Sequence, residues 1–562
     1  MRNFTQQLLY HVVHQPDKNI IIFQKTGEKD LHLSYNELFT RSQIYSDALI
    51  KASVKQGEVV VIILQHSLEL IFAYFGSILN GSIPSIMPFL TEKLLPEKYR
   101  DDLVSLIKIT KPSAIITYTA FCNEVDSLIS DAKSIKTTLI SEYIEKRYIN
   151  LHERSLWEPP GLRRNADDIA LLQHSSGSTG LQKGVALSHQ AVFNQIGHYS
   201  QAINLKQEDV IVSWLPLYHD MGLIACFLMP ILFGTPLVIM SPFDWVRAPH
   251  RLLKSVSDYH GTLCWLPNFA YNFCAKKIRE SDIENVTLSS LRAVINCSEP
   301  MRYESHQMFI DRFSSKGLKK EALATCYAMA ENVFAVTQDG INKPVTYDRV
   351  DLEAYHHDKY AKPAKEGGQS IIMVSAGRPI EHTQVRIVDQ ESNILQERHI
   401  GEIIIKSDCM LTEYYNRKDD TMRSFSDGWF KTGDLGYIAD GELYISGRNK
   451  DLIIVGGKNI YPQDIEDLVS SIDGVHPGRV VAFGIFNEEK GTEDVVVIAE
   501  VEMKNNKTFK DLVLEIKQNV TKKTAISLRN VYLVQEKWLI KTSSGKIARA
   551  ANKEKYLKES AI

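Results

Sequence analysis

HSSGSTGLQKG, residues His174 to Gly184, is the stretch that decides how this chain is interpreted. Apolar runs flank it, Ile169 to Leu172 before and Val185 to Leu187 after, and both are typical of short strands. Its glycines let the backbone approach a bulky ligand, while hydroxyls, loop amides and Lys183 offer donors and a positive charge. This chemistry suits a polyphosphate. Composition alone leaves a Ser/Gly-rich surface hairpin as the alternative.

The stretch is not a Walker loop. That loop requires Lys followed by Ser or Thr at the opening of a helix, whereas Lys183 is followed by Gly184 and a strand. We expect the next helix only after Ser188, a good N-cap residue.

Length and composition limit the class of protein. The chain has 562 residues, too many for one core, so two or more domains are expected. An apolar content of 44% and a charged content of 24% are ordinary for a globular protein, and a net charge of -3 gives no reason to expect a nucleic-acid partner. Seven scattered cysteines without a CxxC pair are typical of reduced thiols in a cytoplasmic protein.

Met221 to Met240 is uncharged and long enough to suggest a membrane span. Pro230, Gly234 and Pro236 interrupt it, so we expect a buried helix followed by a strand from Pro236 to Met240, and no transmembrane segment.

The first 170 residues alternate helical and strand patterns. A capping box at Ser34 to Glu37 opens a helix, the apolar run Val59 to Leu64 is typical of a buried parallel strand, and a helix over Leu68 to Leu79 follows. The alternation of helical and strand patterns continues beyond Val185 and is found again in the last hundred residues. The predicted fold class is α/β: a large N-terminal domain of mostly parallel sheets flanked by helices, and a small mobile α+β C-terminal lid.

Ordered motifs along essentially the whole chain resemble those of the adenylate-forming superfamily, which includes acyl-CoA synthetases, peptide-synthetase adenylation domains, luciferases and fatty acyl-AMP ligases. The 174–184 stretch resembles the phosphate loop of that superfamily, usually near YTSGTTGxPKG, with His174 in place of Tyr and Gln182 in place of Pro. Further resembling stretches are NCSEP at 296–300, CYAMAEN at 326–332, WFKTGDLG at 429–436, ISGRNKDL at 445–452 and KTSSGKIAR at 541–549.

The resemblance implies ATP and Mg2+ as cofactors and a role for each matching residue. The implied phosphate contacts are Ser175, Ser176, Gly177, Ser178, Thr179, Gly180 and Lys183. The implied adenosine contacts are Ser298, Glu299, Tyr327, Ala328, Asp434 and Arg448. Thr179 and Glu331 would hold Mg2+, Lys546 would bridge the substrate carboxylate and the α-phosphate, and Lys450 would be the hinge of the lid.

The stretch LPLYHDMGL, Leu215 to Leu223, is implied to open the pocket for a carboxylic acid. The predicted pocket residues are Trp214, His219, Asp220, Met221, Gly222, Asn268 and Phe269. His219 is alternatively an ordinary loop histidine, and the stretch around Asn268 suits a helix-capping core loop equally well. YHDMGL and PNFAY resemble the fatty acyl-AMP ligase branch, so we expect ATP-dependent conversion of a fatty acid to acyl-adenylate, with an acyl carrier protein as acceptor. A long-chain acyl-CoA synthetase and an amino-acid adenylating enzyme remain alternatives.

The expected domains are 1–449 and 450–562, with an insertion at about 338–372 in the first. The insertion is too long for an ordinary loop, and its apolar residues could pack it down. Its placement resembles the insertion that marks fatty acyl-AMP ligases, which docks on the large domain and hinders lid rotation. A surface excursion without a role is the alternative.

Overall fold

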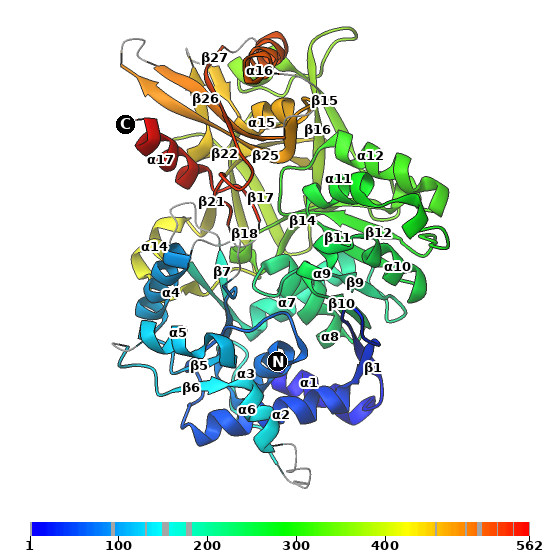
Figure 1. The fold of residues 1–562 in the computed structure, drawn as a ribbon, viewed down its shortest axis with the longest axis vertical. Helices are drawn as coiled ribbons and strands as arrows, with labels where there is room; N and C mark the ends of the chain where they lie inside the picture. The colour runs from blue at the N-terminus through cyan, green and yellow to red at the C-terminus, as the bar shows by residue number, and fades with distance from the viewer. Residues whose placement is uncertain are drawn as a thin grey trace.

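The computed structural model describes residues 3–90, 96–129, 132–148, 157–175, 183–455, 458–488, 492–502, 508–524, 527–542 and 545–560. Within these ranges, a large domain built on two sheets carries a smaller C-terminal domain at one end (Figure 1). The blue and cyan N-terminal segments lie at the bottom of that view, and the orange and red C-terminal segments lie at the top. No helix in the described ranges has both the length and the apolar character that a membrane crossing needs.

The smaller of the two large-domain sheets carries the 174–184 stretch. Its described strands run in the order β19-β8-β7-β4-β3-β5-β6. Strands β3 to β7 pair in parallel, while β7, β8 and β19 pair antiparallel. The bounds are β3 Val59–Ile62, β4 Ile83–Ile86, β5 Ala114–Thr117, β6 Thr137–Ile140, β7 Ile169–Ser175, β8 Lys183–Ser188 and β19 Glu413–Tyr414. The connecting helices are α2 Tyr35–Lys51, α3 Leu68–Asn80, α4 Pro96–Thr110, α5 Thr119–Ile129 and α6 Ser141–Tyr148.

Two predicted helix starts are confirmed. The Ser34 side chain accepts from the Glu37 amide, and the Glu37 side chain accepts from the Ser34 amide, which completes the capping box of α2. The Ser188 side chain accepts from the Ala191 amide at 3.1 Å and starts α7, His189–Ala202.

The larger sheet has 15 described strands and is parallel from β1 to β13. The edge strand next to β1 is β2 Leu31–Ser34, which pairs with it antiparallel. The parallel strands are β1 Asn19–Gln24, β9 Ile211–Ser213, β10 Leu237–Met240, β11 Leu263–Leu266, β12 Ala293–Asn296 and β13 Leu323–Ala328. The associated helices are α1 Phe4–His14, α8 Met229–Phe233, α9 Pro242–Arg247, α10 His250–Asp258, α11 Asn268–Lys277 and α12 Tyr303–Phe313. The uncharged 221–240 segment is a buried π-helix, Met221–Leu228, followed by α8 and β10, so the predicted buried helix and strand are confirmed.

The remaining strands of the larger sheet correct one part of the prediction. The α/β class is confirmed, but the sheet is antiparallel from β13 onward rather than mostly parallel. Short connections, which an antiparallel pair allows and a parallel pair does not, join β13 to β14, β20 to β21 and β21 to β22, whereas the other antiparallel pairs bring together strands farther apart in the chain. Asp440 and Gly441, at φ of 55° and 76°, form the two-residue turn between β21 and β22. The bounds are β14 Ala335–Asp339, β15 Tyr347–Asp351, β16 Ser370–Pro379, β17 Thr383–Val388, β18 Gly401–Ser407, β20 Phe425–Ser426, β21 Trp429–Ala439 and β22 Glu442–Arg448, with helices α13 Leu352–His357 and α14 Lys418–Ser424.

The C-terminal domain has its own core. Residues of α15, β25, β26 and α16, among them Ile465, Val497 and Ile516, form a buried cluster separate from that of the large domain. The bounds are β23 Ile453–Val455, β24 Lys458–Ile460, α15 Pro462–Ser470, β25 Val475–Asn487, β26 Thr492–Val501, α16 Phe509–Thr524, β27 Leu528–Val534 and α17 Arg549–Ser560. This is the predicted small α+β domain.

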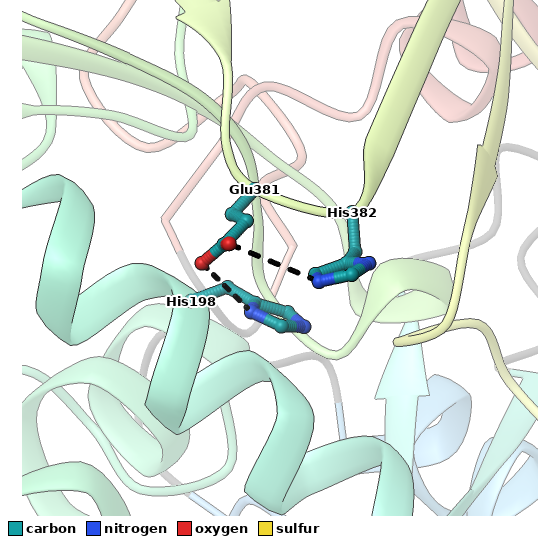
Figure 2. A group of neighbouring side chains, drawn as sticks. All are labelled: His198, Glu381 and His382. Carbon is teal, nitrogen blue, oxygen red and sulfur yellow. Dashed lines mark ion pairs between the residues drawn. The ribbon is translucent and has the colours of Figure 1, made fainter.

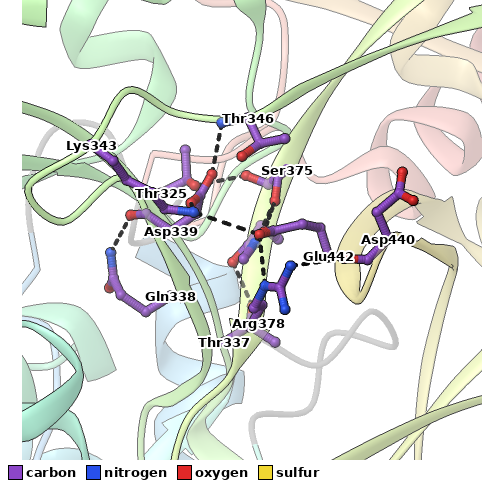
Figure 3. Close-up of polar contacts among 12 residues, drawn as sticks. Thr325, Thr337, Gln338, Asp339, Lys343, Thr346, Ser375, Arg378, Asp440 and Glu442 are labelled. Carbon is purple, nitrogen blue, oxygen red and sulfur yellow. Dashed lines mark hydrogen bonds and ion pairs between the residues drawn. The ribbon is translucent and has the colours of Figure 1, made fainter. Parts of the chain in front are cut away.

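The expected insertion is a packed part of the structure rather than a loose excursion. β15 pairs with β16, and Val345, Val350 and Tyr355 are buried. Figure 3 shows the ion-pair network at its root: Lys343 Nζ lies 2.6 Å from Asp339 Oδ1 and 3.6 Å from Glu442 Oε1. Arg378 Nε lies 3.0 Å from the same Glu442 oxygen. Because both carboxylates are buried and paired, the network fixes the insertion to the sheet.

Candidate active site

The predicted phosphate loop is carried by a hairpin. β7 and β8 pair antiparallel, and Ser175 opposite Lys183 is the last pair before the loop. The flanking strands are therefore confirmed. Ser176, Gly177, Ser178, Thr179 and Gly180 lie outside the described residues, as does Gln182, so their phosphate contacts stay predictions.

His174, which replaces the usual tyrosine, supports the sheet. Its Nε2 lies 2.7 Å from Ser85 Oγ on β4. Burial lowers the pKa of His174 to about 4, so the ring is neutral at physiological pH. The side chain thus links β7 to β4 and brings no charge to the loop.

Tyr414 joins Lys183 and Glu331, two predicted site residues from distant motifs. The Tyr414 hydroxyl donates to Glu331 Oε1 at 2.8 Å, and Lys183 Nζ lies 4.4 Å from the centre of the Tyr414 ring. Burial raises the pKa of Glu331, and the Tyr414 hydroxyl opposes part of that rise by stabilising the anion. Sequence reasoning missed Tyr414, which lies on the two-residue strand β19 beside β8.

The backbone around Glu331 is strained. Glu331 lies on a single 3-10 turn, Ala330–Asn332, and the next residue, Val333, has a φ of 61°. A β-branched residue in this region is an outlier that the surrounding structure must hold in place. Val333 is fully buried, so packing fixes the orientation of the turn.

Tyr327, Asp434 and Arg448 form a second group. The Tyr327 hydroxyl donates to Asp434 Oδ2 at 2.6 Å, and Arg448 Nε lies 3.1 Å from Asp434 Oδ1. A carboxylate has about four acceptor positions, so this one keeps capacity for further hydroxyl donors. Beside it lies an open cavity of about 370 Å³, lined by Thr432, Gly433, Arg448, Asn449 and Lys450. Arg448 and burial lower the pKa of the Lys450 ammonium, with burial the larger effect.

The NCSEP stretch lies between these residues and the predicted acyl pocket. Ser298 has a φ of 69°, and its hydroxyl lies 3.9 Å from the Met221 sulfur. Glu299 Oε2 accepts from the Phe269 amide at 3.0 Å. Ala328 is half-buried at the end of β13.

Lys546 belongs to the C-terminal domain but acts on the large domain. Burial raises the pKa of Glu299, and the Phe269 amide and the Lys546 charge oppose that rise. Burial also opposes ionisation of Asp220, but His219, whose Nδ1 lies 2.5 Å from Asp220 Oδ1, together with Lys546 brings its pKa below the usual value. The charge of Lys546 therefore reaches two carboxylates of the large domain, Asp220 and Glu299.

The predicted pocket residues are partly core. Trp214 stacks on Trp245 with 3.7 Å between ring centres, and Phe269 stands edge-on to both rings. A Cβ at Gly222 would lie 2.2 Å from the Pro216 carbonyl oxygen, so glycine is required there for close backbone packing.

The side chain of Asn268 is used within a polar network. Its Oδ1 accepts from Asn296 and from the Arg302 amide, and its Nδ2 donates to Ser305. Its place in the pocket stays a prediction.

Comparison with known proteins gives the class. The model of the family described as AMP-binding enzyme matches residues 9–415, and the chain belongs to this family. The family is part of the adenylate-forming superfamily that the motifs resemble, so the predicted relationship is confirmed, and the protein is an AMP-forming ligase.

Among individual proteins similar to this chain are ligases that act on fatty acids. The chain is 31% identical over 574 residues to the medium-chain-fatty-acid–[acyl-carrier-protein] ligase JamA of Moorena producens, covering 98% of this chain and 94% of JamA. It is 29% identical to the long-chain-fatty-acid–AMP ligase FadD26 of Mycobacterium marinum, covering 93% and 91% of the two chains. A solved structure from a study of fatty acyl-adenylate ligases of E. coli and L. pneumophila superposes with a TM-score of 0.90 at 26% identity, covering 100% and 98% of the two chains.

Proposed function

We propose that the protein uses ATP to activate a fatty acid as its acyl-adenylate, releases pyrophosphate, and passes the acyl group to the phosphopantetheine thiol of an acyl carrier protein. The observation that carries this proposal is the reach of the Lys546 charge into the large domain. A cation from the C-terminal domain acts on Asp220 and Glu299 of the large domain, where the predicted acyl and nucleotide residues meet.

The chemistry needs no general base, because the substrate carboxylate is itself the nucleophile. It attacks the α-phosphorus of ATP, and the bond to the pyrophosphate oxygen breaks. Catalysis then consists of positioning and charge stabilisation. In this proposal Asp434 accepts hydroxyl groups of the ribose, Lys183 contacts the polyphosphate, and Lys546 lies between the attacking carboxylate and the α-phosphate.

Mg2+ would be held by Glu331 together with Thr179. Mg2+ is a hard cation that prefers oxygen ligands, usually a few from the protein and the rest from phosphate groups. The buried carboxylate of Glu331 fits such a site. The ion would offset charge on the polyphosphate when bound. Tyr414 would keep the Glu331 carboxylate ionised and fix its orientation, and Lys183 lies over the Tyr414 ring.

The existing partners of the Asp220 carboxylate favour a fatty acid over an amino acid as the substrate. An amino-acid substrate needs a carboxylate for its α-ammonium group, but Asp220 Oδ1 is already engaged by His219 and by the Met221 amide at 2.8 Å. The nearby aromatic cluster of Trp214, Trp245 and Phe269 is apolar, and its exposed member, Phe269, offers a ring suited to contact with an alkyl chain.

The insertion favours a carrier protein over free CoA. We infer a boundary at 449/450 with Lys450 as the hinge, so that thioester formation would require the C-terminal domain to rotate. The insertion contacts both domains: Tyr355 lies 5.3 Å from Tyr461 between ring centres, and Asn459 Nδ2 donates to the His356 carbonyl at 3.4 Å. Across the same interface Arg302 Nη1 lies 3.3 Å from Asp464 Oδ1. Rotation of the domain would break these contacts.

A cytoplasmic location is part of the proposal. All seven cysteines are free thiols and six are buried, which suits a reducing compartment.

The test of the proposed reaction is a panel of fatty acids and amino acids incubated with ATP and Mg2+, with acyl-AMP and pyrophosphate measured. We expect acyl-AMP from at least one chain length of fatty acid and none from amino acids. Adenylation of an amino acid but no fatty acid would overturn it.

A further inference from the structure

Two histidines and a glutamate lie together in a part of the large domain that the proposed reaction does not use (Figure 2). His198 is on α7, and Glu381 and His382 form the turn between β16 and β17. Figure 2 shows all three side chains pointing toward one another. Asp408, which follows β18, also lies beside His198. Helix α7, the β16–β17 turn and the residues after β18 thus bring imidazole and carboxylate groups to one place.

The spacing of these atoms is close to that of a metal site. His198 Nδ1 lies 3.7 Å from Glu381 Oε2, and His382 Nε2 lies 3.8 Å from Glu381 Oε1. One ligand atom from each of the three residues can be chosen so that all lie within 4.8 Å of one another. Tetrahedral zinc with bonds of about 2.0–2.1 Å separates its ligand atoms by about 3.3–3.4 Å. Glu381 and His382 are more than half exposed, so small side-chain rotations can close the difference.

The other nitrogen of His198 supports the same interpretation. His198 Nε2 lies 3.2 Å from Asp408 Oδ2, so it can donate its N–H there. In a neutral ring Nδ1 then presents a lone pair toward the Glu381 carboxylate, an arrangement that a cation between them stabilises. A metal-ligating histidine with its second N–H donated to a carboxylate is a recurrent feature of zinc proteins.

We propose that His198, Glu381 and His382 bind one divalent transition-metal ion, with zinc as the best match to two imidazoles and a carboxylate, and that Asp408 is a positioning residue for His198. The ion ties α7, which follows directly after the phosphate-loop strand β8, to the β16–β17 turn. Its role is therefore to stabilise the large domain rather than to take part in adenylation.

Cys409 is not a ligand in this proposal. It lies near His198 Nε2 and Asp408, but its thiol is buried and donates to Asp408 Oδ1 at 3.4 Å. A metal site made of His198, Asp408 and Cys409 would use His198 Nε2, the same nitrogen that donates its N–H to Asp408.

The test is titration of the full-length, metal-free protein with Zn2+ and with Co2+, in the absence of nucleotide. We expect one tight site by calorimetry, a visible Co2+ spectrum of nitrogen and oxygen ligands, and a higher Tm with Zn2+. His198→Gln and His382→Asn should weaken binding at least tenfold. Asp408→Asn should weaken it roughly tenfold to a hundredfold while keeping the Co2+ spectrum, as loss of an outer-shell partner does.

His260→Asn is the matched control, because His260 and His382 are both exposed and have left-handed backbones with φ of 52° and 55°. Asparagine tolerates that conformation, so neither substitution strains the chain. Unfolding curves in EDTA should be the same for all variants. If His382→Asn or His198→Gln binds zinc as tightly as His260→Asn does, the cluster is not a metal site. Unchanged affinity in Asp408→Asn would remove Asp408 from its positioning role.

Discussion

Lys546→Ala tests the most specific feature of the proposed site, the cation that the C-terminal domain contributes. The Lys546 charge helps to lower the pKa of Asp220 and opposes the rise in the pKa of Glu299, and in the proposed mechanism it stabilises the negative charge of the transition state. Removal of one such preorganised contact typically slows the chemical step by about 10²–10³-fold, or roughly 2.7–4 kcal/mol. We expect a loss of at least roughly a hundredfold in acyl-AMP formation. ATP affinity should persist, because the hairpin that carries the phosphate loop is untouched.

The matched control is Lys541→Ala. Lys541 is in the same terminal segment and opposes the rise in the pKa of Glu299, but it is not among the main influences on the pKa of Asp220. We expect it to lose less than about tenfold, since an outlying charge contributes less than a direct contact. The assay is single-turnover acyl-AMP formation at saturating ATP and fatty acid, with nucleotide binding measured separately by calorimetry. Equal losses in the two variants, or an active Lys546→Ala enzyme, would refute the assignment.

Three further predictions concern the residues around this site and the insertion. Glu331→Gln should raise the Mg2+ concentration needed for half-maximal adenylation. It should also stabilise the protein at pH 8 but not near pH 4: burial raises the folded pKa of Glu331, so its ionisation opposes folding once pH exceeds the unfolded value of 4.5; a thermal unfolding series that gives equal gains at both pH values would contradict this. Tyr414→Phe removes a hydrogen bond to a charged group, about 1.5–3 kcal/mol, and should lower kcat/KM for ATP roughly tenfold to a hundredfold; unchanged kinetics would show that Tyr414 does not position Glu331. Trimming of about residues 341–368 should preserve adenylation and raise CoA-thioester formation, and Tyr355→Ala, which removes a buried contact with Tyr461 without a deletion, should act in the same direction; CoA turnover that stays at the wild-type level in both would remove the insertion from acceptor choice.

Local signals predicted the parts of the fold that depend on neighbouring residues. The caps at Ser34 and Ser188 and the strands on both sides of the phosphate loop could be read from the sequence because each depends on a few adjacent side chains. The Asp440–Gly441 turn is an equally local hairpin signal, but it accounts only for the β21–β22 pair. Most other antiparallel pairs join strands separated by long connections, which leave no local signal.

Contacts between distant segments were not predictable in this way. Tyr414 meets Glu331 only because β19 pairs with β8, and a two-residue strand leaves no periodic pattern. His198 and Glu381 come together through the packing of α7 against the β16–β17 turn, which no spacing in the sequence records. Motif order supplied candidate residues, whereas the register of the sheet decided which of them touch.

We propose that this protein makes acyl-adenylate and delivers the acyl group to a carrier protein rather than to CoA. The most direct measurement forms the acyl-adenylate on the enzyme in a single turnover and then adds CoA or a phosphopantetheinylated acyl carrier protein, with the two thioesters quantified by mass spectrometry. We expect transfer to the carrier and little or no acyl-CoA. Acyl-CoA formation as fast as adenylation would contradict it and identify the enzyme as an acyl-CoA synthetase.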